Sequence, residues 1–351
     1  MSIDYSIGYY QNNLWNDDIR KVIADYQHIS EVYFALPGQP SGREPLGDKD
    51  RLADTEKTLL ADLVWMRERN IKLTLLLNAA CYGDQLLSES FLDGLLKTVD
   101  RYVYDYGVTT ITTTSPAIAN WVKRHYGDKI ETRASINMRV GNIDALEYLK
   151  EQFDGYYVRR ELYRSFDYLS HIKAWAVRNG KKLYALVNSG CLAYCPWQSM
   201  HDNHIAHSVF AKQMPDGTTI PECSYYLEKN NCRLAVLKGT FIRPEDVEHY
   251  TTIFDGFKIA TRSHLLPRII VKAYTEQRFE GNLMDLMEPG HTGLFKPYVL
   301  RNDLFPADWI DHVKNCERKC HQCDYCERML EKLFLESHEE PNFRKYIYST
   351  P

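Results

Sequence analysis

Short β-rich segments alternate with longer amphipathic stretches along most of the chain, and this alternation constrains the fold more than any other feature. Helical stretches such as 55–70, 88–106 and 165–179 separate the β-rich segments. The eight segments that we predict to be strands are 5–10, 31–36, 72–78, 108–113, 131–137, 155–161, 183–188 and 256–261. Eight strand–helix units over about 265 residues predict an α/β protein with an eight-stranded parallel β/α (TIM-like) barrel. An open doubly wound sheet is the alternative.

Two places interrupt the alternation. Residues 191–243 separate the seventh and eighth strands, which is far longer than an ordinary strand–helix loop, so we expect a functional insertion there. Within it residues 234–241 read as a strand, and Pro244 is well placed to open a helix. We therefore expect a barrel domain over 1–287 and a small Cys-rich extension over 288–351 that ends in a loose tail.

Eight of the nine cysteines fall into two groups, and Cys81 is the remaining one. A chain of 351 residues can bury a large core without disulfides, so metal binding is the better interpretation of the groups. The net charge of −4 gives no electrostatic indication of a nucleic-acid partner, although it does not exclude one. No apolar run is long enough for a membrane helix and no leader pattern is present, so we expect a cytoplasmic protein.

The first cysteine group follows the seventh strand. That strand ends in Asn-Ser-Gly and leads directly into Cys191 and Cys195, and Cys223 and Cys232 return from the same insertion. The C-terminal ends of the strands form the catalytic mouth of a β/α barrel. Four thiolates there suit an iron–sulfur cluster or a zinc ion that pins the insertion, and their spacing does not separate the two.

The second group is Cys316, Cys320, Cys323 and Cys326. On an unbroken helix its first and last members would lie about 15 Å apart, too far for one centre, so the segment must wrap. A four-thiolate zinc site or a second iron–sulfur cluster would both make it do so, separately from the first group.

Several strand ends carry motifs in a characteristic order. The motifs are Arg43 after the second strand, Asn78 at the end of the third, Ala134-Ser135-Ile136-Asn137, Arg160-Glu161-Leu162 and Lys258-Ile259-Ala260-Thr261-Arg262. In this order the chain resembles the collagenase-like peptidase family U32, and most closely its iron–sulfur members, which hydroxylate their substrates without oxygen. The resemblance implies a four-iron four-sulfur (4Fe-4S) cluster on the first cysteine group. The chain differs from the family in having Ser189-Gly190 at the end of the seventh strand, where the family has His-Gly.

Charged and amide side chains at the strand ends are the candidate site. Residues two apart on a strand share a face, so Lys258 and Arg262 point the same way, as do Arg133 and Asn137. If these faces are inward, the mouth is cationic and suits a carboxylate; the alternative is a structural layer of ion pairs. We expect catalytic roles for Arg160, Glu161, Lys258 and Arg262, and binding roles for Arg43, Asn78 and Asn137.

The sequence thus predicts an iron–sulfur enzyme that hydroxylates an aromatic or unsaturated substrate without oxygen, using a carboxylate-bearing co-substrate. One alternative is a U32-type peptidase acting on peptides, although the chain lacks both a Gly-x-Ser-x-Gly elbow and a His-Glu-x-x-His helix. Another is a non-catalytic cluster-bearing subunit that pairs with a homologous partner.

Overall fold

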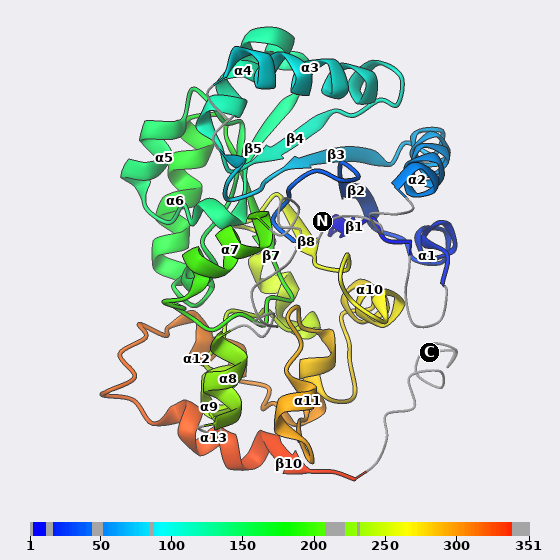
Figure 1. Cartoon of the computed structure of the whole chain (residues 1–351). Coiled ribbons are helices and arrows are strands. Elements are labelled where there is room, and N and C mark those ends of the chain that lie inside the picture. Colours follow the sequence, from blue (N-terminus) through cyan, green and yellow to red (C-terminus); the bar gives the residue numbers. More distant parts are fainter. Residues whose placement is uncertain are drawn as a thin grey trace.

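Eight parallel strands close into a barrel in the order in which they occur along the chain (Figure 1). The computed structural model describes residues 3–11, 17–43, 52–83, 88–207, 222–229 and 232–338. The strands are β1 (Tyr5–Gly8), β2 (Ile29–Ala35), β3 (Lys72–Leu77), β4 (Thr110–Thr113), β5 (Glu131–Ala134), β6 (Gly155–Tyr157), β7 (Lys182–Leu186) and β8 (Gly256–Ile259). The last strand pairs in parallel with the first, with Ser6 opposite Lys258. The predicted barrel is confirmed.

Helices cover the outside of the barrel and bury their apolar faces against the strands. They are α1 (Ile19–Asp25), α2 (Leu52–Arg67), α3 (Glu89–Tyr104), α4 (Pro116–Tyr126), α5 (Ile143–Leu149), α6 (Phe166–Arg178) and α10 (Pro267–Thr275). Local chemistry sets several starts: the Ser88 hydroxyl accepts a hydrogen bond from the Phe91 amide at α3, and Ser115 precedes Pro116 at the first position of α4. In the described ranges, no helix combines the length and apolarity needed to cross a membrane.

Several predicted strands extend past their true ends. Strand β5 stops at Ala134 because the Ser135 hydroxyl accepts a hydrogen bond from the Asn137 amide and starts a short 3₁₀ helix. Strand β6 stops at Tyr157, and Arg160 opens the 3₁₀ helix η5 (Arg160–Arg164). Asn137, Arg160 and Glu161 therefore lie on turns just beyond the strands, whereas Lys258 lies within β8.

The described part of the insertion after β7 contains helices joined by irregular segments. Its helices are α7 (Gln198–His207), α8 (Glu222–Lys229) and α9 (Arg233–Leu237). The prediction of a strand over 234–241 is wrong, because the Lys238 amide donates to the Leu234 carbonyl and the turn buries Val236 and Leu237 together. Pro244 does open a helix, η7 (Pro244–Tyr250), as predicted.

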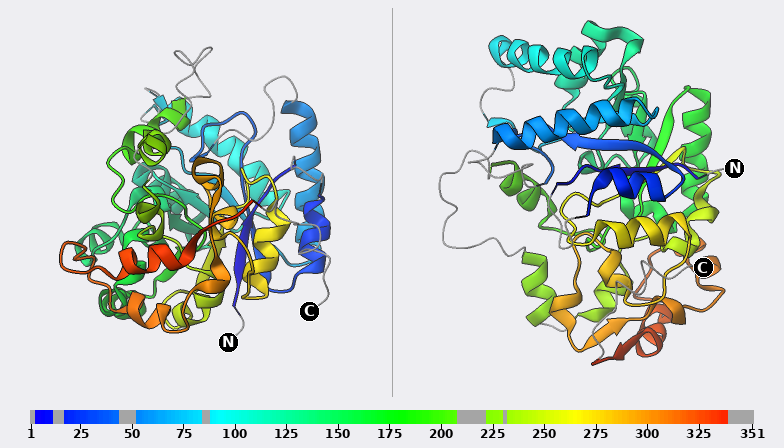
Figure 2. Two further views of the ribbon diagram at one scale, coloured as in Figure 1. Left: turned by 90° about the horizontal axis from the view of Figure 1, so that it is seen from below. Right: turned by 90° about the vertical axis from the view of Figure 1, so that its right-hand side faces the viewer.

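The C-terminal extension packs against the insertion (Figure 2). It contains α11 (Thr292–Phe295), β9 (Tyr298–Leu300), α12 (Trp309–Lys314), α13 (Tyr325–Leu333) and β10 (Phe334–Glu336), with β10 antiparallel to β9. Arg164 on the barrel donates to the Leu237 carbonyl at 2.8 Å, and Arg318 on the extension donates to the Lys238 carbonyl at 3.0 Å. These hydrogen bonds, the first of them buried, tie α9 to both the barrel and the extension. Residues 339–351 of the predicted tail lie outside the described residues.

Candidate functional site

Arg43 lies at the centre of the C-terminal mouth. Its Nε donates to Glu288 Oε1 at 2.9 Å. Burial alone would lower the pKa of Arg43, but Glu288, and then Cys191, outweigh burial and raise it. Sequence reasoning missed Glu288, because it belongs to no motif and follows the barrel by almost thirty residues.

Glu288 is fixed by backbone hydrogen bonds to the segment after β7. Its amide donates to the Asn188 carbonyl at 2.9 Å, and its carbonyl accepts from the Gly190 amide at 3.1 Å. A Cβ on Gly190 would lie only 2.0 Å from the Pro289 carbonyl oxygen, so only glycine fits there. This contact therefore requires a glycine at position 190, whereas the Ser189 hydroxyl before it accepts a hydrogen bond from Arg160.

Lys258 points into the barrel lumen between two aromatic rings. Its Nζ lies 3.7 Å from the ring centroid of Tyr33 and 5.2 Å from that of Tyr157. Burial, followed by the positive charge of Arg262, lowers the pKa of Lys258 to about 7. A substantial fraction of this side chain is therefore an uncharged amine at neutral pH.

Arg262, Asn78 and Asn137 surround the turn that carries Arg43. The Arg262 guanidinium donates to the Ser41 hydroxyl at 3.0 Å, and Asn78 Oδ1 accepts from the Gly42 amide at 3.0 Å. A Cβ on Gly42 would come within 2.7 Å of the Asn137 amide nitrogen and 2.8 Å of that of Asn78. The two asparagines therefore lie against this turn and support it.

Arg160 and Glu161 are neighbours with different roles. Arg160 donates to the Ser189 hydroxyl at 2.9 Å. Burial alone would lower the pKa of Arg160, but Cys191 and Glu161 more than compensate and raise it. Glu161 accepts from Arg159 at 2.9 Å and from the Tyr194 amide at 3.2 Å, so it supports the cysteine loop. Arg160, and not Glu161, belongs to the mouth.

Four cationic side chains thus gather at this end of the barrel, and we call them the cationic mouth. They are Arg43, Arg160, Lys258 and Arg262. The positive charge of Arg43 opposes protonation of both Arg160 and Lys258, which shows that these groups lie within electrostatic reach of one another. The arrangement creates a positive potential that an anionic ligand would offset.

Three cysteines of the first group lie beside the cationic mouth and interact with one another. Burial, then Cys191 and Cys195, raise the pKa of the Cys223 thiol to about 11. Burial also raises the pKa of Cys195, with a further contribution from Cys191. The Cys232 thiol lies beside the Tyr226 hydroxyl. No three His, Cys, Asp or Glu side chains of the described residues stand in a metal-binding arrangement.

The second cysteine group lies on a wrapped segment, as its spacing requires. The chain between α12 and α13 is irregular, and Arg318 in its middle has a positive φ of 55°. Cys316 contributes to the raised pKa of Cys326 after burial, so these two thiols are near each other. Cys320 and Cys323 are exposed. Zinc or iron–sulfur binding by this group stays a prediction.

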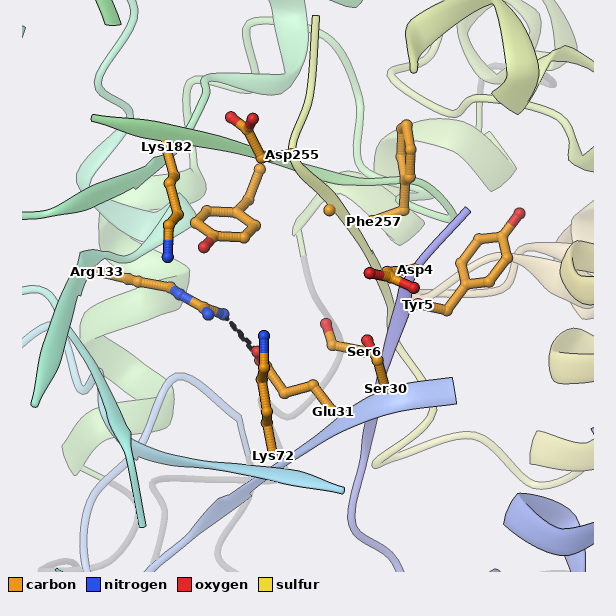
Figure 3. Close-up of a pocket in the computed structure, with 12 residues that line it drawn as sticks. Asp4, Tyr5, Ser6, Ser30, Glu31, Lys72, Arg133, Lys182, Asp255 and Phe257 are labelled. Atoms are coloured by element: carbon orange, nitrogen blue, oxygen red, sulfur yellow. Dashed lines mark hydrogen bonds and ion pairs between the residues drawn. The ribbon is translucent and has the colours of Figure 1, made fainter. Parts of the chain in front are cut away.

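The N-terminal end of the barrel holds a separate polar cavity of about 200 Å³ (Figure 3). There Arg133 donates to both carboxylate oxygens of Glu31, at 2.9 and 2.8 Å, and to Glu131 at 2.7 Å. Its guanidinium also lies 4.1 Å from the Tyr184 ring centroid. The expectation that Arg133 faces the mouth with Asn137 is wrong, because its two carboxylate partners hold it at the opposite end. For this residue the alternative of a structural ion-pair layer is correct.

Comparisons with known proteins agree with this architecture. No family model matches the chain. It is 27% identical over 278 residues to the uncharacterized protease MJ1657 of Methanocaldococcus jannaschii, covering 76% of this chain and 79% of the relative. Its fold is similar to the structure of the U32 peptidase Mk0906, with a TM-score of 0.53 and 13% identity over 74% of this chain and 92% of the other.

The fold and the mouth define an eight-stranded β/α barrel with cysteines and clustered guanidinium groups at its C-terminal end. The fold of the solved U32 peptidase agrees with the barrel that the sequence predicts, and the relative over three quarters of this chain is named as a protease.

Proposed function

We propose that the chain is a U32-type peptidase that binds its peptide substrate through a carboxylate in the cationic mouth. The observation that carries the proposal is the gathering of Arg43, Arg160 and Arg262 around the lumen that holds Lys258. Guanidinium groups bind carboxylates through paired, charge-assisted hydrogen bonds. The protease relative supports the same class of reaction.

Lys258 is the residue best suited to activate water for hydrolysis. Its neutral amine can accept a proton from a water molecule as the oxygen attacks the peptide carbonyl carbon. The same proton then passes to the departing amine as the carbon–nitrogen bond breaks, which restores the neutral lysine. A neighbouring guanidinium can hold the oxyanion that forms between these two steps.

Matched peptides test the proposal. A peptide with a free C-terminal carboxylate and the same peptide with a C-terminal amide are compared for cleavage by the full chain. We expect cleavage of the free acid, and an Arg262→Met variant should raise its KM by about ten- to a hundredfold, since a charged hydrogen bond contributes about 1.5–3 kcal/mol. Arg124, which is exposed on α4, provides the control variant Arg124→Met. Equal cleavage of acid and amide, or no cleavage of any peptide, would contradict the proposal.

Iron–sulfur-dependent hydroxylation is the second candidate, and the cysteines favour it. Cys191 contributes to the raised pKa of Cys195, and both contribute to the raised pKa of Cys223, so these three sulfur atoms lie near one another. With Cys232 they would supply the four soft donors that a 4Fe-4S cluster takes, once their side chains move into a ligating arrangement that the described residues do not show. When bound, such a cluster would supply electron transfer beside the carboxylate-binding groups.

Anaerobic purification followed by iron, sulfide and Mössbauer measurements tests the second candidate. We expect a Cys191→Ala, Cys223→Ala double variant to lose the cluster signal of the barrel. Cys81 belongs to neither group, so Cys81→Ala is the matched control. A chain that holds no iron when purified without oxygen would exclude the candidate and leave the peptidase proposal intact.

A further inference from the structure

The surroundings of Lys258 suit chemistry beyond proton transfer. Among the described residues, its Nζ contacts the rings of Tyr33 and Tyr157 but makes no hydrogen bond and no ion pair. The Tyr33 hydroxyl donates to the Ile259 carbonyl at 2.9 Å, so it is directed away from the amine. A buried primary amine without a hydrogen-bonding partner has its lone pair available.

We infer that Lys258 is a nucleophile that captures 2-oxo carboxylates in the barrel as an imine. The inference uses the carboxylate-binding mouth of the proposed function but does not require peptide hydrolysis. In a 2-oxo acid the carbonyl carbon is bonded directly to the carboxylate. A ligand whose carboxylate binds Arg43 or Arg262 therefore holds its carbonyl carbon within the region of the Lys258 amine, because both arginines lie within electrostatic reach of that amine.

The charges around Lys258 favour the neutral, nucleophilic form. Arg262 and Arg43 oppose its protonation, whereas Glu31 and Glu288 favour it, and burial is the largest influence. The balance lowers the pKa of the amine to about 7. Lysines activated in this way by burial and neighbouring cations form imines with carbonyl compounds.

The arginines recognise the carboxylate of the ligand, and the rings of Tyr33 and Tyr157 select the group on the other side of its carbonyl carbon. Both are almost fully buried and flank the amine. Flat aromatic surfaces favour a ligand with an apolar or unsaturated group next to its carbonyl carbon.

The step balances without a further reactant. The Nζ lone pair forms a bond to the carbonyl carbon, and the carbonyl oxygen leaves as water with the two protons lost from the amine. Glu288 lies within electrostatic reach of Lys258 and can relay these protons. Its Oε2 is buried and has no hydrogen-bond partner among the described residues, so it is free to accept one.

Reductive trapping tests the inference on the full chain. The protein is incubated with pyruvate or with acetone in the presence of cyanoborohydride, which reduces an imine to a stable secondary amine, and peptide mass mapping locates the label. We expect one pyruvate adduct on Lys258, formed at least about tenfold faster than the acetone adduct because only pyruvate carries a carboxylate. Mapping on the unchanged protein means that the result does not depend on whether a variant folds.

Two variants sharpen the test. Lys258→Met should abolish the adduct. Lys182→Met should retain the adduct, because Lys182 is the first residue of β7, at the N-terminal end of the barrel, and pairs with Glu131 at 2.8 Å. Label scattered over other lysines, no label on any lysine, or equal rates with acetone would overturn the inference. Peptide cleavage without trapping would overturn the imine inference and leave the peptidase proposal intact. Trapping without peptide cleavage would support the imine inference and contradict the peptidase proposal.

Discussion

Replacing Lys258 with methionine should stabilise the protein, although it removes a buried contact. The folded state lowers the pKa of this lysine from 10.5 to about 7, so folding disfavours its charged form. At a pH below about 7 the amine is charged in both states, and the folded state carries the full cost. As the pH rises from 7 to 10.5 that cost declines, and above 10.5 it disappears. Methionine has a similar length and carries no charge at any pH.

The expected gain follows from the size of the pKa change. A fall from 10.5 to about 7 corresponds to about 5 kcal/mol, at about 1.4 kcal/mol for each tenfold change in the protonation equilibrium. The difference in unfolding free energy between Lys258→Met and the unchanged protein should therefore be about 5 kcal/mol near pH 6. It should fall to about 1 kcal/mol near pH 10.

Denaturant unfolding of both proteins between about pH 6 and pH 10 measures this difference. Other titrating groups are common to the two proteins and cancel in the comparison. Lys182→Met serves as the control, because this half-exposed lysine is paired with Glu131 and its loss should bring no stabilisation. A Lys258→Met protein that is less stable at pH 6, or whose advantage does not change with pH, would refute the reasoning.

Three further changes test other parts of the structure. Arg133→Met should destabilise the barrel by about 3–5 kcal/mol in denaturant unfolding, because it leaves the carboxylate of Glu31 buried without its partner. Gly190→Ala should lower the melting temperature and weaken carboxylate binding, since its Cβ would lie 2.0 Å from a backbone oxygen. Replacing Cys320 and Cys323 with alanine should remove about half of the bound metal and retain the spectrum of the barrel centre, if the two cysteine groups are separate sites.

Matched controls separate these effects from general damage. Arg124→Met removes an exposed arginine and should change unfolding by less than about 0.5 kcal/mol. Gly94→Ala adds a methyl group to α3 with no atom within 4 Å, so it should stabilise the helix by about 0.5–1 kcal/mol. An Arg133→Met protein as stable as Arg124→Met would show that the buried ion pair contributes nothing. Loss of all metal from the cysteine variant would indicate one shared centre.

The barrel could be predicted because strand and helix periodicity are local properties of the sequence. Each strand was found, but the ends of β5 and β6 were placed too late. Ser135 and Asn137 are compatible with a strand by pattern, yet a side-chain hydrogen bond between them turns the chain. Such short-range competition changes an end by a few residues and leaves the element in place.

The mouth was predicted in part, and the missing part comes from distant contacts. Arg160, Lys258 and Arg262 were found because strand ends carry the chemistry of β/α barrels. Glu288 could not be found, because its place beside Arg43 depends on backbone hydrogen bonds across about a hundred residues. Glu161 was assigned to catalysis as part of the Arg160-Glu161-Leu162 motif, whereas its hydrogen bonds direct it to the cysteine loop.

The two ends of the barrel use buried cations in opposite ways, and this difference locates the site. Arg133 lies between Glu31 and Glu131, so its charge is compensated and its removal should cost stability. Lys258 lies beside Arg262 and Arg43, so its charge is opposed and its removal should increase stability. A fold keeps a group that weakens it when that group serves another purpose, and strongly perturbed ionisable groups gather at functional sites. The stability cost expected for Lys258 therefore follows from the same opposed charge that favours ligand chemistry at the C-terminal mouth, away from the compensated ion pair at the opposite end.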